Sequence, residues 1–328
     1  MERILRIGMG FWESRTLLSA VELGVFTVLG HRQLTAEQLR RELGLHPRST
    51  RDFLDALVAM DMLRRTDDRY ANTADTATYL DSTGSEYIGG FLEMAAARLY
   101  PFWGGLTEAL RSGQPQNEAK YGGDFFTTLY RDPRRLYDFQ RAMTGLTLPS
   151  AHPIAEQFPW HRWKTVADIG TAQGALLRTV LETNPHLYGI GYDLPPVEPI
   201  FADYSAPVED RISFQPGDFF EDDLPEADVL VFGHILHDWD LPTKRMLLEK
   251  AYRALPEGGA VLVYESFIDD DRRSNLPGLL MSLNMLIETP GGFDYTAADL
   301  RTWLADTGFQ EPVTEHLAGP ESMVWAVK

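Results

Sequence analysis

The chain has 328 residues, of which 44% are hydrophobic and 24% are charged, a composition typical of a globular protein large enough to form two regions. Its formal net charge of −18 would repel the phosphate backbone of a nucleic acid, which argues against nucleic acid as a partner. Because the chain has no cysteine, disulfides, thiolate metal ligands and a cysteine nucleophile are excluded. No apolar stretch approaches the roughly 20 residues of a membrane span, and the N-terminus lacks the apolar core of a signal peptide, so we expect a soluble, cytoplasmic protein.

The N-terminal region has the pattern of a small helical domain with a hairpin. Residues 1 to about 30 form an amphipathic helical region, after which Thr35 and Gln38 form the capping box of a short helix. A further helix follows, and residues 63–66 and 70–73 are typical of the two strands of a hairpin. The order helix, helix, hairpin predicts a winged helix.

Winged helices often bind DNA, but the residues of this one do not favour that function. The helix before the hairpin offers Arg48 and Arg51, while Asp52 and Asp55 lie on the same stretch and the whole chain is acidic. We therefore interpret the winged helix as a packing or dimerisation module. The N-terminal helices are too apolar to stand exposed on a monomer, and together with the family resemblance described below they predict a homodimer.

Residues 86–150 are mostly helical and rich in aromatic residues and methionine. Most such residues at helical spacing pack in a core, but the remainder could line an apolar pocket for a flat substrate. Pro149, Pro153 and Pro159 then interrupt the chain before the next apolar strand. They predict a boundary between a domain of residues 1–150 and a domain of residues 151–328.

From residue 166 onward, strands and helices alternate, a pattern typical of an α/β fold with a mainly parallel sheet covered by helices on both faces. Ligands of such sheets bind beyond the carboxyl ends of the strands. The predicted strands are residues 166–168, 190–193, 212–215, 229–232, 260–265 and 322–327. Six polar residues fall at or just past strand ends, on the edge where a site is expected: Asp168, Asp193, Asp218, His234, His237 and Glu265.

Residues 166–193 have the pattern of a nucleotide-binding half-unit: a strand, a turn of small residues, a helix and a second strand that ends in Asp193. Gly170, Ala172 and Gly174 allow a tight turn and a close approach of a ligand to the backbone. Asp193 lies where such units place the acid that binds the ribose hydroxyls. The turn alone is compatible with a dinucleotide cofactor, with S-adenosylmethionine (SAM) and with a merely structural strand-turn-helix that binds no cofactor.

A second informative segment, residues 233–240, follows an apolar strand and contains His237. A neutral imidazole accepts a proton near pH 7, so His237 is the natural general base of the chain. Glu265, at the end of the following strand, and Asp294, in a loop with two glycines, are placed to orient it. We interpret His234 as a residue that packs beside the pocket or lines it. The sequence has no cluster of metal ligands, so we expect no metal cofactor.

These motifs resemble those of the SAM-dependent small-molecule O-methyltransferases, namely the plant caffeate and flavonoid type and the bacterial counterparts that tailor polyketides and antibiotics. The resemblance spans nearly the whole chain and includes the N-terminal segment GLHPRSTRDFLDALVAMDML. It rests on Asp193-Leu194-Pro195, similar to D-L-P at the ribose, Gly217-Asp218-Phe219, similar to G-D-F/M beside the adenine, and His237-Asp238-Trp239, similar to H-D-W. The resemblance implies a Rossmann-like class I methyltransferase domain preceded by an all-helical plus winged-helix dimerisation domain.

The resemblance also implies roles for individual residues. His237 is expected to be the catalytic base, flanked by Glu265 and Asp294. The residues expected to bind SAM are Asp168, Gly170, Gly174, Asp193, Leu194, Asp218, Phe219, Gly233 and Trp239. Those expected to line the acceptor pocket are Trp103, Phe139, Met143, His234 and Met285.

Three positions depart from the family pattern. Ala172 stands where the family's glycine-rich turn has glycine, Gly233 where relatives often have a basic residue, and Asp294 where they usually have glutamate. The sequence therefore predicts a divergent member that methylates a hydroxyl of an aromatic or polyketide-like secondary metabolite. The alternatives are N- or C-methylation, a SAM-binding relative that transfers no methyl group, a nicotinamide oxidoreductase and a metabolite-sensing winged-helix regulator.

Overall fold

The structure, a computed structural model, describes residues 1–121, 129, 130 and 132–328. These residues form two compact units, Met1–Pro101 and Phe102–Lys328. The chain thus divides between residues 101 and 102, whereas the sequence pattern placed the boundary after residue 150. Among the described residues, no helix combines the length and the apolar character that crossing a membrane requires.

The proline-rich segment that predicted this boundary is helical instead. Pro149 and Pro153 lie inside the long helix Pro133–Gln157 (α11). A proline in a helix interior removes a backbone hydrogen bond, but α11 buries one whole side of this segment and packs closely against Ala175–Thr183 (α12). This packing outweighs the loss, and the helix ends only before Pro159.

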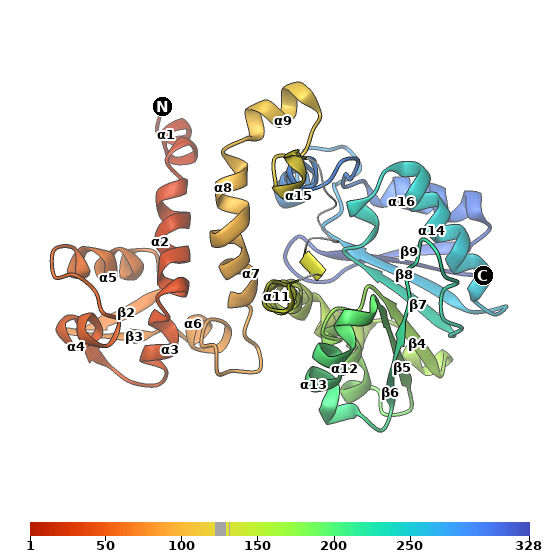
Figure 1. Ribbon diagram of the computed structural model, residues 1–328, viewed down its shortest axis with the longest axis horizontal. Helices are drawn as coiled ribbons and strands as arrows, with labels where there is room; N and C mark the ends of the chain where they lie inside the picture. Colours follow the sequence, from red (N-terminus) through yellow and green to blue (C-terminus); the bar gives the residue numbers. More distant parts are fainter. Residues whose placement is uncertain (122–128, 131) are drawn as a thin grey trace. The chain divides into compact units, whose positions relative to one another are not determined.

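The first unit consists of short helices and a three-stranded antiparallel sheet (Figure 1). Thr35 caps α4, and Gln38 completes the capping box that the sequence predicts. The predicted hairpin is present as β2 and β3, and β1 pairs with the other side of β3. The elements are α1 (Glu2–Gly8), α2 (Phe11–Glu22), α3 (Val25–Leu29), β1 (Leu34–Thr35), α4 (Ala36–Glu42), α5 (Thr50–Ala59), β2 (Leu63–Thr66), β3 (Arg69–Asn72), α6 (Ala74–Tyr79) and α7 (Gly89–Met94), followed by a π-helical turn (Ala95–Leu99) and α8 (Tyr100–Trp103) at the division.

The second unit is built on a seven-stranded sheet in the order β6-β5-β4-β7-β8-β10-β9. The five strands from β6 to β8 are parallel, and β10 runs antiparallel to both of its neighbours. The strands are β4 (Thr165–Ile169), β5 (Tyr188–Asp193), β6 (Ile212–Pro216), β7 (Val229–Gly233), β8 (Ala260–Glu265), β9 (Gln310–His316) and β10 (Ser322–Val327). The further helices are α9 (Leu106–Ser112), α13 (Glu198–Ser205), α14 (Leu241–Ala254), α15 (Leu276–Glu288) and α16 (Ala297–Thr307).

Helices cover both faces of this sheet because successive apolar residues of a strand point to opposite faces. Val166 and Val229 pack with α11, α12 and α13, whereas Ala167 and Leu230 pack with α14 and α16. Figure 1 shows these two groups of helices on opposite sides of the sheet. The α/β fold class with a mainly parallel sheet is thereby confirmed. The strand β9 was not predicted because its sequence is polar and half exposed at the sheet edge, without the alternation of a buried strand.

Candidate active site

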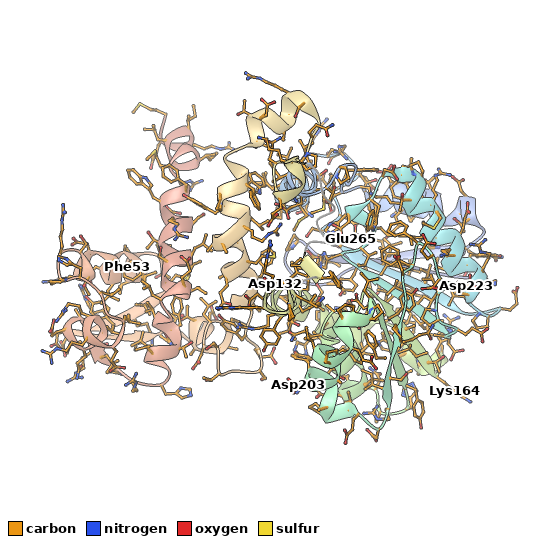
Figure 2. All side chains as sticks on the ribbon, in the orientation of Figure 1. Phe53, Asp132, Lys164, Asp203, Asp223 and Glu265 are labelled. Atoms are coloured by element: carbon orange, nitrogen blue, oxygen red, sulfur yellow. The ribbon has the colours of Figure 1, made fainter. Side chains whose placement is uncertain are left out.

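A cavity of about 440 Å³ lies beyond the carboxyl ends of the parallel strands, where ligands of such sheets bind. Figure 2 shows that Glu265, which ends β8, and Lys164, which precedes β4, lie at opposite ends of the sheet. The predicted site residues that line the cavity are Asp168, Gly170, Asp193, Leu194, Asp218, Phe219, Gly233, His234 and Trp239, together with Phe139 and Met143 from α11.

The turn after β4 approaches the end of β5 closely. The backbone N–H of Ala172 donates to Oδ2 of Asp193 at 3.0 Å. Gly170 and Gly174 have φ angles of 75° and 85°, which glycine adopts without a steric penalty. Gly174 is not among the residues that line the cavity; it precedes α12 at a point where a Cβ would lie 2.7 Å from the ring of Phe201. Its role is therefore conformational.

Ala172 occupies the middle of this turn with a φ of 53° and lines the cavity. In this left-handed region a Cβ approaches the following carbonyl oxygen, which costs about 1 to 2 kcal/mol. The alanine in place of the family's glycine thus retains the glycine conformation at an energetic cost.

Two buried carboxylates stand at the ends of β4 and β5. Oδ1 of Asp193 accepts the Leu194 N–H at 2.8 Å and the Tyr130 hydroxyl at 3.2 Å. Asp168 accepts the hydroxyl of Thr171 at 3.0 Å. Burial raises the pKa of Asp193 to about 6 and that of Asp168 to about 7. The hydrogen bonds from Ala172, Leu194 and Tyr130 hold the Asp193 carboxylate at a position from which it can bind vicinal hydroxyl groups.

Aromatic rings form the part of the cavity next to Asp218. The rings of Phe219 and Trp239 meet edge to face at 5.9 Å, and those of Phe220 and Trp239 at 4.8 Å. The Nζ of Lys250 donates to the carbonyl of Phe219 at 2.7 Å and fixes the backbone there. Apolar ring faces beside a carboxylate suit a purine base that carries an amino group.

Gly233 does not accommodate the basic side chain that relatives often carry at this position. A Cβ on Gly233 would lie 2.1 to 2.2 Å from ring atoms of Tyr264, far inside van der Waals contact. Tyr264 itself lines the cavity. Its ring occupies the space of a side chain at position 233, so this position of the ring requires glycine there.

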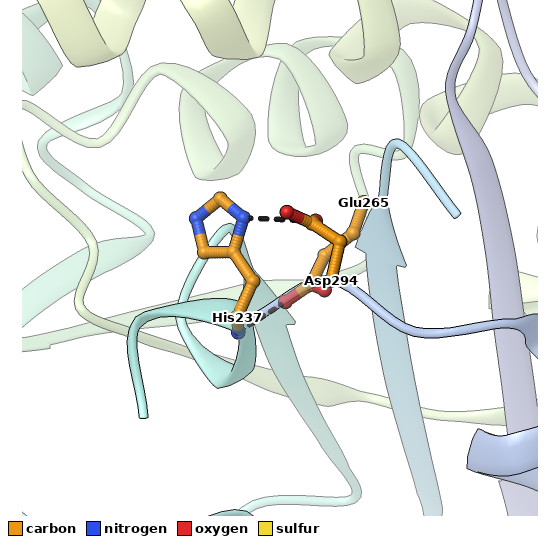
Figure 3. Close-up of side chains that lie close together, drawn as sticks. All are labelled: His237, Glu265 and Asp294. Atoms are coloured by element: carbon orange, nitrogen blue, oxygen red, sulfur yellow. Dashed lines mark hydrogen bonds and ion pairs between the residues drawn. The ribbon is translucent and has the colours of Figure 1, made fainter. Parts of the chain in front are cut away.

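His237, Glu265 and Asp294 come together at the ends of β7 and β8, and all three are buried. Nδ1 of His237 donates to Oδ1 of Asp294 at 3.2 Å, whereas Glu265 accepts the backbone N–H of His237 at 3.1 Å (Figure 3). Asp294 therefore orients the ring, and Glu265 holds the segment from which the ring projects. The geometry fixes the tautomer in which Nε2 is the basic atom.

The charges around His237 favour its protonated form. Burial alone lowers the pKa of the imidazole, but the carboxylates of Asp294, Glu265 and Asp238 together raise it to about 10. Burial raises the pKa of Glu265 to about 7 and that of Asp238 to about 6. The acids of the cluster therefore favour a proton on the ring of His237.

The same three residues offer ligand atoms within 4.8 Å of one another, a spacing that a metal ion could use. However, Nδ1 of His237 and Oδ1 of Asp294 already bond to each other, and Glu265 binds a backbone N–H. These direct contacts account for the arrangement without an ion.

The acceptor-pocket residues that the resemblance implied do not all reach the cavity. His234 does, with a φ of 54°, and its Nε2 lies 3.7 Å from Oε2 of Glu321. Burial lowers the pKa of His234 to about 3, so its ring is neutral. Trp103 and Met285 are not among the lining residues: Trp103 donates to Asn284 of α15 at 2.9 Å, and Met285 is buried in the same helix.

Three residues at the site were not among those predicted: Tyr130, which bonds to Asp193, Tyr264, whose ring lies against Gly233, and Lys244 on α14. Lys244 is fully buried, and its charge interacts with Glu265, Asp294 and Asp238. Its signal was present in the sequence, because Leu241, Lys244, Leu248 and Ala251 lie on one side of a helix and the other three are apolar.

A mainly parallel sheet with one inserted antiparallel strand, an acid at the end of β5 and an aromatic-lined cavity form a site that fits SAM, and they define the class of SAM-dependent methyltransferases. The family profile of the O-methyltransferase domain matches residues 103–310, and that of the O-methyltransferase dimerisation domain matches residues 5–82. The chain belongs to the O-methyltransferase family. The predicted family, fold class and cofactor are thus confirmed, and the dimerisation match supports the predicted homodimer.

The similarity to individual relatives extends over the whole chain. The chain is 41% identical over 323 residues to the tetracenomycin polyketide synthesis 8-O-methyl transferase TcmO of Streptomyces glaucescens, covering 98% of this chain and 94% of TcmO. It is 32% identical over 317 residues to the N,N-dimethyltransferase OxyT of Streptomyces rimosus, covering 96% and 92% of the two chains. The crystal structure of human N-acetylserotonin methyltransferase in complex with SAM superposes with a TM-score of 0.92 at 29% identity and covers 100% of this chain and 97% of the human one.

Proposed function

We propose that this O-methyltransferase methylates a hydroxyl on an aromatic, polyketide-like acceptor, with His237 as the general base. The bond between Nδ1 of His237 and Asp294 carries the proposal, because it leaves Nε2 as the atom that accepts a proton. When bound, SAM supplies a methyl group already activated on a sulfonium. The residues of the chain then have to hold the acceptor in line and remove its proton.

The cofactor-binding role proposed for Asp193 follows from its place and its bonds. The carboxylate is fixed by Ala172 and Leu194 and faces the cavity, where it would bind the ribose hydroxyls. Phe219 and Trp239 would enclose the adenine. The other proposed contacts are Asp168, Gly170, Leu194 and Asp218, whereas Gly174 and Gly233 act through backbone shape.

The acceptor would occupy the side of the cavity lined by Phe139, Met143 and His234. The aromatic ring of Phe139, the thioether of Met143 and the neutral imidazole of His234 suit a flat, largely apolar molecule. Similarity to TcmO, an 8-O-methyl transferase of tetracenomycin polyketide synthesis, supports a polyketide-like acceptor for this chain. Similarity to OxyT keeps N-methylation as a second candidate.

The first unit is proposed to be a winged-helix module that forms a homodimer. Its N-terminal helices expose large apolar side chains, including Ile4 at 75%, Ile7 at 68% and Trp12 at 62%, which a dimer would cover. We also propose that the protein works in the cytoplasm, where SAM is made and used.

An acceptor panel tests the proposed reaction. The purified full-length chain is incubated with SAM labelled in its methyl group and with N-acetylserotonin, a hydroxylated polycyclic aromatic or an aromatic amine of similar size. We expect label on oxygen of the polycyclic aromatic and none in reactions without the protein. Label on the amine alone would replace O-methylation by N-methylation as the activity.

A further inference from the structure

His234 is a buried histidine that removal of the acceptor proton does not require. It follows β7, lines the cavity and exposes only 8% of its surface. Its φ of 54° lies in the left-handed region, where a residue other than glycine is uncommon and often marks a functional site. The backbone N–H of His234 donates to the carbonyl of Tyr264 at 3.3 Å, which fixes this conformation against β8.

Both nitrogens of the His234 ring are enclosed, and neither has a hydrogen-bond partner among the described residues. The ring packs edge to face on that of Tyr264, with 5.3 Å between the ring centres. A buried polar atom without a partner costs free energy, so nearly all such atoms in native proteins are paired. Because His234 lines the cavity, a bound acceptor is well placed to supply the missing partner.

An acid stands beside this ring. Oε2 of Glu321, in the turn between β9 and β10, lies 3.7 Å from Nε2 of His234 and has no hydrogen-bond partner among the described residues. Oε1 accepts the hydroxyl of Ser266, just past β8, which holds the carboxylate in place. Burial raises the pKa of Glu321 to about 7. Above that pH the carboxylate attracts an N–H at Nε2, so the lone pair of the neutral ring lies on Nδ1.

We propose that His234 is a specificity-determining residue: its Nδ1 accepts a hydrogen bond from a second hydroxyl of the acceptor, while Glu321 fixes the tautomer of the ring. The inference rests on the proposed function, because it assumes that the acceptor lies beside His237. The ring centres of His234 and His237 are 5.7 Å apart. Two hydroxyl groups of one fused-ring acceptor can bridge this separation, one to be methylated and one to be bound.

The tautomer determines which acceptors fit. A lone pair on Nδ1 accepts a hydrogen bond from a hydroxyl, but an ether oxygen has no proton to donate. A site built to bond one hydroxyl rejects analogues without it, because its buried polar atoms then stay unpaired. The preferred acceptors are therefore dihydroxylated aromatics, and the methyl ether of the second hydroxyl is disfavoured.

The first experiment needs no substitution. The full-length protein, saturated with S-adenosylhomocysteine, is titrated by calorimetry with a naphthol, with naphthalenediols and with the monomethyl ethers of those diols. The titration is made at about pH 8.5, above the pKa of Glu321. We expect at least one diol to bind about tenfold more tightly than the naphthol and than its own monomethyl ether, the effect of one buried hydrogen bond. Equal affinities, or failure of every diol to bind, would overturn the inference.

His234→Phe removes both ring nitrogens and retains a flat ring, so the preference for the diol should disappear. His234→Asn keeps a polar side chain that tolerates the left-handed backbone, and should retain part of the preference. His316→Phe is the matched control, because His316 is an exposed histidine of β9 that does not line the cavity. A preference that persists in His234→Phe, or that is lost equally in His316→Phe, would contradict the role of His234.

Glu321→Gln tests the tautomer and covers the case in which His234→Phe does not fold. If the amide oxygen accepts the Ser266 hydroxyl, the NH₂ group stands where Oε2 lies beside Nε2 of His234. It then donates to Nε2, so that Nδ1 carries the ring proton and becomes a donor. We expect this variant to bind the monomethyl ether as tightly as the diol. A preference for the diol as large as that of the wild type would mean that Glu321 does not set the tautomer, and the inference would fail.

The two proposals fail separately. The titrations involve no methyl transfer, so they test His234 even if the labelled methyl group appears only on an amine, which would overturn the proposed O-methylation. If the naphthols are methylated on oxygen but bind with equal affinities, the proposed function stands and only the role of His234 is wrong.

Discussion

Asp294 reaches His237 although its side chain is one methylene shorter than the glutamate expected at its position. Oδ1 of Asp294 lies 3.2 Å from Nδ1 of His237. The loop comes close because Gly292 packs on the backbone of the histidine segment: a Cβ on Gly292 would lie 2.6 Å from the carbonyl oxygen of His237. The glycine thus lets the loop lie close enough for the shorter acid to reach the ring.

Asp294→Asn should separate orientation from binding. The amide retains the shape of the side chain but cannot stabilise the imidazolium, so kcat is expected to fall by about 10²-fold, the lower end of the range for general-base catalysis. The dissociation constant for SAM, measured by calorimetry, should not change, because Asp294 does not line the cavity. Equal losses of kcat and SAM affinity would mean that Asp294 supports the fold of the site and not the base.

The pH dependence of the reaction follows from the pKa of His237, which the neighbouring acids raise to about 10. Below this value the ring is protonated and cannot accept a proton, so kcat/KM for the acceptor should rise with pH in the alkaline range. The positive charge of bound cofactor disfavours the imidazolium, so kcat should reach its plateau at lower pH than kcat/KM for SAM, which reports the enzyme without cofactor. A rate independent of pH from 6 to about 10 would contradict a titrating base.

Much of the second unit could be predicted because its strands are short apolar runs that end in polar residues. β8 agrees with the predicted range 260–265, and Asp193 ends β5 as expected. Pro149 misled the prediction of the domain boundary, because its local effect on a helix is opposed by the burial of α11, which only the tertiary structure reveals.

Ala172→Gly should stabilise the protein. The φ of 53° at Ala172 costs about 1 to 2 kcal/mol for alanine, and glycine regains this energy at the expense of about 0.4 to 1 kcal/mol of unfolded-chain entropy. The net gain corresponds to a rise in Tm of about 2 °C for a domain of this size, measured by calorimetry in the absence of ligand.

Ala305→Gly is the control for that substitution. Ala305 is exposed and lies in the regular helix α16, where glycine costs about 1 kcal/mol. Its Tm should fall. If both variants lose stability to the same extent, the turn at Ala172 is not strained.

Chelation tests the interpretation of the buried cluster. Since His237, Asp294 and Glu265 are engaged in direct hydrogen bonds, we expect methyl transfer to continue after dialysis against EDTA. Loss of activity that a divalent cation restores would instead assign the cluster to a metal ion.

The site was harder to predict than the sheet, and for a physical reason. A sequence motif identifies site residues that are adjacent in the chain, as in His237-Asp238-Trp239. The ring of Tyr264 fills the space beside Gly233 on the neighbouring strand. The charge of Lys244, on α14, interacts with the carboxylate of Glu265, on β8. Such pairs become visible only when the strands and helices are packed.

The most direct test of the central claim is the turnover of His237→Ala compared with its affinity for SAM. We expect kcat to fall by about 10² to 10⁴-fold, the contribution of a general base, while the dissociation constant for SAM stays within about twofold. His161→Ala, which removes an exposed histidine, is the control and should leave both values unchanged. A His237→Ala protein that turns over as fast as the wild type across the pH range would contradict general-base catalysis by this residue.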